Sequence, residues 1–483
     1  MRLLLKLAAA TSLAAPLAAG YSFAQSGPGA IQIPRHERIE LPNGITLVIM
    51  PRGEVPLIAF NAVLRGGALG DPPGKPGVAS LVAGLLEKGA GERDAFAFAE
   101  AVEGVGGSFN AFAGAESINV VGQFLARDQD LMLELLADAL LRPRFAPEEF
   151  EKLRARQIEL IKAAKDSDPS ELLGTYGRAF LFGDHPYGRP VSGSESSLAA
   201  ITHQDVLDYY RAQFSGERLT LVFAGAVDAP SLRRAVTRAF ASWPKARSKP
   251  DALPAPAPLR GRRVLLVDSP GSSQTYFWIG NVGVAKHDPA RAALDLVNTL
   301  YGGRFTSILN TELRVKSGLS YGARSGFTRG SVPGEFSIRS FTQTENTGKA
   351  LELAIETLRR LHTEGVSSEM LESARAYVLG QYPLTLETAA DWAAAIGELE
   401  LYGLGTEYIE GYGPALRSVT LADARAVIDR AFPSVENLAI VLIGDAERIR
   451  EDARRFGTLV EMELLEPAFR PASPRSAAAA RSD

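Results

Sequence analysis

The stretch Ile201-Thr-His-Gln-Asp205, followed by the apolar run Leu219-Thr-Leu-Val-Phe-Ala-Gly225, occurs a second time in the chain. The second copy reads Val419-Thr-Leu-Ala-Asp423 and leads to Leu438-Ala-Ile-Val-Leu-Ile-Gly444, with a Phe 13 residues after the start of each copy. A Thr followed three residues later by Asp is typical of a helix N-terminus, and the apolar run is typical of a buried strand. The two copies start 218 residues apart. The sequence therefore predicts two homologous units of about 210 residues each.

A Pro- and Ala-rich stretch separates the two copies. Residues 246–259 contain prolines at 250, 254, 256 and 258, a composition typical of an extended linker. We therefore expect one domain over residues 35–245 and a second over residues 260–467.

Strand and helix patterns cluster within the first unit and do not alternate regularly. Arg38–Pro51 predicts a β-hairpin, and Leu57–Leu64 predicts a further strand. Helices are expected over Gly77–Lys88, Asp128–Leu141 and Pro147–Lys165. This arrangement indicates an α+β fold in which each unit is a largely antiparallel sheet packed by helices.

The composition is that of an ordinary globular chain. Of the 483 residues, 46% are hydrophobic and 22% are charged, which excludes wholesale disorder. The net charge is −4, so the overall charge gives no reason to expect a nucleic-acid partner. The chain has no cysteine, which excludes disulfides, thiolate metal sites and a cysteine nucleophile.

Both ends of the chain differ in composition from the rest. Residues 1–24 carry Arg2 and Lys6 before an Ala/Leu run that ends in small residues, as a signal peptide does. The run is interrupted by polar residues and Pro16, so we expect cleavage and export to the periplasm without a stable membrane anchor. Residues 470–483 contain mainly Pro, Ser, Ala and Arg, and we expect a disordered tail.

Several segments, taken in order, resemble the insulinase/pitrilysin family of zinc metallopeptidases. They are Gly77-Val-Ala-Ser-Leu-Val-Ala-Gly-Leu-Leu-Glu-Lys-Gly89, Gly106-Gly-Ser-Phe-Asn-Ala111, Arg142-Pro-Arg-Phe with Pro147-Glu-Glu-Phe, His185-Pro-Tyr-Gly-Arg-Pro190, and Glu312-Leu-Arg-Val-Lys-Ser-Gly-Leu-Ser-Tyr321. The resemblance covers nearly the whole chain after the leader. It implies repeated α+β units that close like a clamshell around a peptide, with this chain forming half of the clamshell.

The zinc motif of that family is missing. Active relatives carry His-x-x-Glu-His on the first long helix, and this chain has Ser80, Ala83 and Gly84 at the three positions. The family's third ligand, a Glu, would fall near Ile161 or Lys162. Glu159 is close by, but one carboxylate does not hold zinc. The resemblance therefore implies no metal and no catalytic residue in this part of the chain.

No other set of residues suggests a replacement site. The five histidines are scattered along the sequence: His36, His185, His203, His287 and His362. Turn geometry explains His185 as well as a function does. Ser80 has no His nearby in sequence and is better explained as a small packed residue than as a nucleophile.

A second family feature is retained. The resemblance places Arg314 and Tyr321 where the family has an Arg and a Tyr that reach the substrate carbonyl from the second half of the clamshell. A guanidinium and a hydroxyl aimed at that oxygen stabilise the negative charge that develops during hydrolysis. The alternatives are that Arg314 complements a helix dipole and that Tyr321 is a half-buried strand aromatic.

Two functions of different classes follow. In the first, the chain is inactive alone and contributes Arg314 and Tyr321 to the zinc site of a homologous partner subunit that hydrolyses peptides. In the second, it is a catalytically inert clamshell that binds peptides or organises a complex. The residues at the zinc motif oppose a third possibility, an independently active peptidase.

Overall fold

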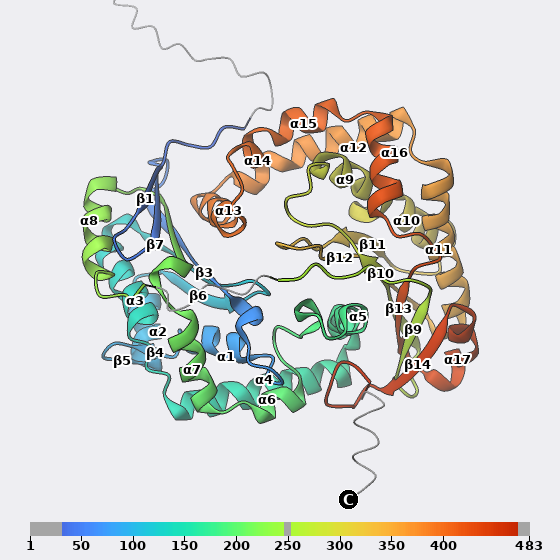
Figure 1. The fold of residues 1–483 in the computed structure, drawn as a ribbon, viewed down its shortest axis with the longest axis horizontal. Coiled ribbons are helices and arrows are strands. Elements are labelled where there is room, and N and C mark those ends of the chain that lie inside the picture. The colour runs from blue at the N-terminus through green and yellow to red at the C-terminus, as the bar shows by residue number, and fades with distance from the viewer. Residues whose placement is uncertain (1–30, 246–252, 472–483) are drawn as a thin grey trace, which may run out of the picture.

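The computed structural model describes residues 31–245 and 253–471. The predicted leader 1–24, half of the linker 246–259, and all but the first two residues of the tail 470–483 lie outside the described residues. The described chain contains two six-stranded sheets, one in each half (Figure 1).

The two sheets have the same internal order. The first runs β6 (Ser108–Ala113), β7 (Ser117–Leu125), β3 (Leu57–Arg65), β8 (Leu219–Gly225), β2 (Thr46–Pro51) and β1 (Glu37–Glu40). The second runs β11 (Ala323–Phe327), β12 (Glu335–Gln343), β10 (Gln274–Val282), β13 (Ala439–Gly444), β9 (Arg263–Asp268) and β14 (Thr458–Glu463). Only the last strand differs, since β1 pairs antiparallel with β2 whereas β14 pairs parallel with β9. The predicted α+β fold of two homologous, largely antiparallel units is confirmed.

Helices cover both sheets. In the first half they are α1 (Val78–Leu85), α2 (Ala95–Glu103), α3 (Gln129–Leu141), α4 (Pro147–Ser167), α5 (Leu173–Phe182), α6 (Glu195–Ala200), α7 (His203–Gln213) and α8 (Ala229–Ala239), with a two-strand ribbon of β4 (Gly89–Ala90) and β5 (Arg93–Asp94). In the second half they are α9 (Arg291–Asn298), α10 (Ile308–Asn310), α11 (Thr347–Glu364), α12 (Ser368–Gln381), α13 (Ala389–Tyr402), α14 (Glu407–Glu410), α15 (Tyr412–Ser418), α16 (Leu421–Ala431) and α17 (Ala446–Arg455). Within the described ranges, none of these helices is both long enough and apolar enough to cross a membrane.

The repeated sequence motif forms the same structure twice. Thr202 begins α7 and Thr420 begins α16, and each Thr hydroxyl accepts a hydrogen bond from the backbone N–H three residues later. In turn, the carboxylates of Asp205 and Asp423 accept a hydrogen bond from the backbone N–H of Thr202 and Thr420, at 2.7 Å and 2.8 Å. Each helix leads to a fully buried strand, β8 or β13, which lies inside its sheet.

The two halves exchange one helix each. Figure 1 shows α5, from the first half, beside the second sheet and α13, from the second half, beside the first sheet, in agreement with their packing against β10 and β3. A glycine permits each close approach. A Cβ on Gly177 of α5 would lie 2.6 Å from the Trp278 ring in β10, and one on Gly397 of α13 would lie 2.8 Å from the Asn61 amide in β3. The halves are therefore interlocked.

Helix α1 is shorter than its sequence predicts. It ends at Leu85, about one turn before the expected end at Lys88. The N–H of Leu86 is shared between the carbonyls of Val82 and Ala83, which closes the helix early. Gly89 has a φ of +103° as expected of a stop signal, but it begins the β4 strand and does not cap α1.

Candidate functional site

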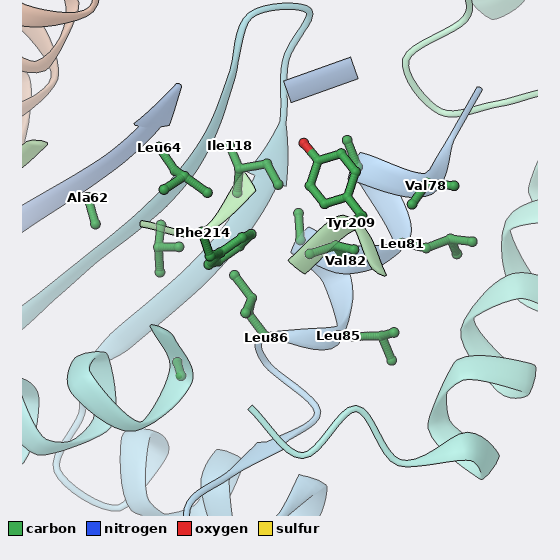
Figure 2. Packing of buried hydrophobic residues seen from close by; sticks show 14 of the residues in the cluster. Ala62, Leu64, Val78, Leu81, Val82, Leu85, Leu86, Ile118, Tyr209 and Phe214 are labelled. Carbon is green, nitrogen blue, oxygen red and sulfur yellow. The ribbon is translucent and has the colours of Figure 1, made fainter. Parts of the chain in front are cut away.

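Helix α1, which carries the positions of the family's zinc motif, is a core element. Leu81, Val82 and Leu85 are fully buried, and the helix packs between the first sheet and α7. Figure 2 shows its side chains beside Tyr209 of α7 and Phe214 at the end of that helix. Most of α1 therefore serves packing, and only one side of it meets α4 and a cavity.

The side of α1 toward α4 contains no metal ligand. Ser80 is half-buried, and its Oγ accepts a hydrogen bond from Nε2 of Gln157 on α4 at 3.2 Å. Ala83 is fully buried. Gly84 faces Leu153 so closely that a Cβ there would lie 2.8 Å from Leu153 Cδ2. The space that a second His would need is thus taken by a leucine from α4.

The region of the family's third ligand is equally unsuited to a metal. Ile161 is buried, whereas Lys162 pairs with Glu159 at 2.9 Å on the exposed side of α4. A hydroxyl, a methyl group and an aliphatic side chain do not coordinate zinc. In the part of the chain that the structure describes, no three His, Asp or Glu side chains are grouped to hold a metal ion. The residues present here do not fit a zinc ion.

Four of the five histidines instead tie loops together through backbone carbonyls. His36 bonds to Pro34 O, His185 to Pro254 O, His203 to Phe145 O and His362 to Pro433 O, at 2.6 to 3.1 Å. Such bonds fix turns and chain crossings. The second ring nitrogen of His185 accepts a hydrogen bond from the N–H of Tyr187, two residues later, at 3.1 Å. This local bond agrees with the explanation of His185 by turn geometry.

A cavity of about 500 Å³ lies beside Ser80 and is bordered by the end of the described chain. Phe469 forms part of its wall and stacks edge-on against Tyr176 of α5, with ring centroids 5.0 Å apart. Lys165 anchors this C-terminal segment, because its ammonium group donates to the carbonyl of Glu466 and pairs with Glu195 at 2.7 Å. We call residues 464–470 the C-terminal strap.

Arg314 and Tyr321 lie together in a second cavity of about 720 Å³. Arg314 stands on a π-helical turn, Thr311–Lys316, that follows α10. Its Cζ lies 4.5 Å from the centroid of the Tyr321 ring and 4.8 Å from that of Phe305. The structure thus brings the two residues into contact.

Tyr321 is not the half-buried strand aromatic that was the alternative prediction. The strand β11 begins two residues later, and Tyr321 lies in the preceding loop with 74% of its surface exposed. Its hydroxyl makes no hydrogen bond within residues 31–245 and 253–471. An exposed phenol held by a guanidinium is free to donate to a ligand.

Three further arginines in this cavity were not predicted from the sequence. Arg304, Arg324 and Arg339 line the cavity together with Arg314. Arg324 lies on the edge strand β11 and Arg339 beside it on β12, where the strands pair. Arg304 and Arg324 lie close in sequence to Arg314 and Tyr321, which was the available signal, whereas strand pairing brings in Arg339 from further along the chain.

The two cavities both border residues 170–175, at the start of α5. Leu172 and Thr175 line the cavity at Ser80, whereas Ser170 and Leu173 line the cavity at Arg314. Arg314 and Tyr321 do not line the cavity at Ser80. Arg314 and Tyr321 thus line the second cavity, whose lining contains none of Ser80, Ala83 and Gly84.

Comparison with known proteins gives the family. The insulinase (peptidase family M16) model matches residues 59–195, and the peptidase M16 inactive domain model matches residues 200–378. The chain belongs to the insulinase family.

Curated relatives of the insulinase family match over most of their length. An uncharacterized zinc protease of Mycobacterium tuberculosis is 28% identical over 405 residues, which is 83% of this chain and 91% of the relative. An uncharacterized zinc protease of Streptomyces coelicolor is 28% identical over 81% of this chain and 86% of its own length.

Solved structures share the insulinase-family fold. A peptidase M16 inactive domain from Pseudomonas fluorescens superposes with a TM-score of 0.79 at 22% identity, over 85% of this chain and 98% of its own. A protease from Helicobacter pylori superposes with a TM-score of 0.77 at 19% identity, over 86% of this chain and 100% of its own. The curated relatives bear the name of zinc proteases, whereas this insulinase-family chain has Ser80, Ala83 and Gly84 at the positions of the family's zinc motif.

Proposed function

We propose that this chain is the non-catalytic subunit of an exported heterodimeric zinc metallopeptidase. Its task is to contribute Arg314 and Tyr321 to the zinc site of a homologous partner, and its substrates are peptides. Zinc belongs to the partner, and this chain carries no cofactor. The leader 1–24 supports an exported, periplasmic location.

The observation that carries the proposal is the contrast between the two cavities. At Ser80 the ligand positions are replaced, Leu153 lies against Gly84, and Gln157 binds the Ser80 hydroxyl. At Tyr321 the guanidinium–phenol pair is intact, the phenol is exposed, and neither side chain has a hydrogen-bond or ion-pair partner among the described residues. A chain that has lost metal binding has no use of its own for an exposed oxyanion-binding pair.

The chemistry of the pair suits peptide hydrolysis. When a peptide carbonyl is attacked, its oxygen becomes negatively charged, and donors aimed at that oxygen stabilise the transition state more than the ground state. The Tyr321 hydroxyl supplies one donor. The Arg314 guanidinium supplies a charged donor, and its stacking between two aromatic rings, Phe305 and Tyr321, holds it in place.

The alternative is a catalytically inert clamshell that binds peptides or organises a complex. Such a scaffold needs neither the hydroxyl of Tyr321 nor its exposure. The two functions therefore differ in what happens when this one oxygen is removed.

The test is steady-state peptide hydrolysis by the chain reconstituted with an exported homologue that has an intact His-x-x-Glu-His motif. Tyr321→Phe in this subunit alone should lower kcat by about 10²- to 10³-fold, the usual loss for one oxyanion donor. Arg314→Ala should lower kcat and raise KM, because a charged donor also positions the bound carbonyl.

The control is Ser80→Ala, which removes a hydroxyl at the degenerate motif and should leave activity nearly unchanged. If Tyr321→Phe keeps more than about half of the wild-type kcat/KM, the composite site is rejected in favour of the scaffold.

A further inference from the structure

The cavity around Tyr321 has an unusual charge for a chain whose net charge is −4. Four arginines line it: Arg304, Arg314, Arg324 and Arg339. Its lining contains no Asp and no Glu. The remaining wall is formed by uncharged residues, so positive charge is concentrated on one concave surface.

Three of the four arginines have no carboxylate partner within 4.0 Å in the described chain. Arg304 donates to the hydroxyl of Ser373 at 3.1 Å, which is a neutral partner. Arg314 contacts only the rings described above. Arg324 is exposed and makes no hydrogen bond or ion pair to any described residue. The guanidinium groups of these three cavity-lining arginines are therefore not neutralised by a carboxylate of the described chain, and a bound carboxylate could accept charge-assisted hydrogen bonds from them.

The fourth arginine, Arg339, has a carboxylate nearby, but that carboxylate does not cancel the positive charge at the cavity. Arg339 lies 3.8 Å from the buried carboxylate of Glu335, which it shares with Arg178 at 3.6 Å. One carboxylate thus faces two guanidinium groups. Burial, together with the positive charges of Arg178 and Arg324, lowers the pKa of Arg339, although Glu335 acts in the opposite direction. An anion entering the cavity would relieve this repulsion.

Exposed aromatic rings border the same surface. Phe305 is 64% exposed, Tyr321 is 74% exposed and Tyr377 is 43% exposed. Rings flanking guanidinium groups are suited to hold an extended chain by its apolar parts while its charged groups meet the arginines.

We propose that this cavity binds carboxylate groups of the peptide substrate beside the carbonyl-binding pair, so that the peptidase prefers acidic peptides. A planar guanidinium donates two parallel hydrogen bonds to a carboxylate, which selects this group over a neutral amide of the same shape. The carboxylate comes either from Asp and Glu side chains or from the free C-terminus of the peptide. The inference deepens the proposed function and names the substrate class of that site.

The experiment measures binding of short fluorescent peptides to the full chain alone, so it requires neither a partner nor hydrolysis. An Ala/Glu peptide is compared with its Ala/Gln counterpart, each with a free and with an amidated C-terminus, at low and at physiological salt. The Ala/Glu peptide should bind about tenfold or more tightly, and the difference should shrink as salt screens the charges.

Arg324→Gln is the decisive variant, because Arg324 has no partner in the described chain and its loss should leave the fold unchanged. It should weaken the Ala/Glu peptide about tenfold and leave the Ala/Gln peptide unaffected. Arg234→Gln is the matched control, since Arg234 on α8 is exposed, makes no hydrogen bond or ion pair to any described residue and lies in the other half of the chain. Thermal unfolding of both variants checks that the fold is intact.

The outcomes distinguish the two possible sources of the bound carboxylate. They also distinguish failure of this inference from failure of the proposed function. A preference carried by the Ala/Glu side chains, or by the free C-terminus, supports the inference and identifies which carboxylate is bound. Equal binding of Glu and Gln peptides, no effect of Arg324→Gln, or equal binding of a single-stranded oligonucleotide overturns it. Charge selectivity without any effect of Tyr321→Phe on the reconstituted pair would overturn the proposed function and leave only the binding of acidic peptides standing. Loss of activity in Tyr321→Phe without charge selectivity would support the proposed function and overturn this inference, which rests on it.

Discussion

Asp71 holds the N-terminus of α1 from a buried position and makes the stability of the fold depend on pH. Its two carboxylate oxygens accept hydrogen bonds from the N–H groups of Gly77 and Ala79, at 2.8 Å and 2.7 Å. Burial raises the pKa of Asp71 from 3.8 to about 7, although these bonds and the charge of Arg189 act in the opposite direction. Between these two values the folded chain holds a proton that the unfolded chain has released. Stability therefore falls as the pH rises through this window.

Replacing this carboxyl group by an amide should abolish its share of the pH dependence. Relative to Asp71→Asn, the wild-type chain should lose up to about 4 kcal/mol of unfolding free energy between about pH 4 and about pH 8. Urea unfolding at a series of pH values measures this difference. Asp423→Asn is a control of opposite sign. Hydrogen bonds from Thr420 lower the pKa of Asp423, so its contribution is lost as the pH falls through its lowered pKa. A constant difference between wild type and Asp71→Asn would contradict the argument.

At the scale of elements, the contact between α1 and α4 has closed the space of the zinc motif. Gly84→His should destabilise the chain by about 1–3 kcal/mol, because its Cβ would meet Leu153 Cδ2 at 2.8 Å. Combined with Leu153→Ala, the cost should be smaller than the sum of the two single changes by about 1 kcal/mol. Ser80→His introduces the same side chain on the cavity side and should cost less than Gly84→His. Additive costs in the double variant would show that Leu153 does not fill this space.

The C-terminal strap is a second element whose removal should be costly. Phe469 is 4% exposed and lies between Tyr176 and Lys165, so Phe469→Ala should destabilise the chain by about 3 kcal/mol. Leu465 belongs to the same strap but is 76% exposed, and Leu465→Ala should change the unfolding free energy by less than about 0.5 kcal/mol. Urea unfolding compares the two variants. Similar losses would mean that the strap does not depend on its buried ring.

Local sequence patterns predict the helices and strands, but they do not predict contacts between residues far apart in the chain. The caps at Thr202 and Thr420 and the β1–β2 hairpin depend on residues a few positions apart, so the sequence contains what is needed to predict them. The exchange of α5 and α13 depends on strands more than about 90 residues away, and no local pattern reports it. For the same reason Ser80 could be identified as a lost ligand from its motif, whereas its neighbour Gln157, 77 residues later, could not.

The whole molecule keeps the retained pair apart from the degenerate motif. Each half covers the sheet of the other through α5 or α13, and residues 170–175, at the start of α5, border both cavities. Contacts between the halves hold this arrangement, including the ion pair of Arg38 with Glu400 at 2.7 Å and the bond from Ser331 N to Glu116 at 2.8 Å. In the proposed composite site, the metal that Arg314 and Tyr321 face therefore belongs to a second molecule.

Purified alone, the chain is expected to contain no stoichiometric zinc and to leave unstructured peptides uncut. The reason is the set of side chains at the ligand positions, Ser80, Ala83 and Gly84, which offer no imidazole or carboxylate. Elemental analysis and a peptidase assay with and without a chelator are the measurements. One equivalent of zinc together with chelator-sensitive cleavage by the lone chain would contradict the expectation.

Co-expression with a homologue that has an intact zinc motif should yield a complex of one copy of each chain. Each of the two chains would contribute both of its interlocked halves to the contact. A permanent interface between chains typically buries more than roughly 2,000 Å². Light scattering on the purified complex gives the stoichiometry, and peptide hydrolysis should appear only in the complex. Tyr321→Phe should leave the complex assembled while lowering its activity, because the exposed phenol makes no bond that the fold needs. If both chains remain separate monomers when co-expressed, the pair of Arg314 and Tyr321 has no metal site to serve, and the composite peptidase must be abandoned.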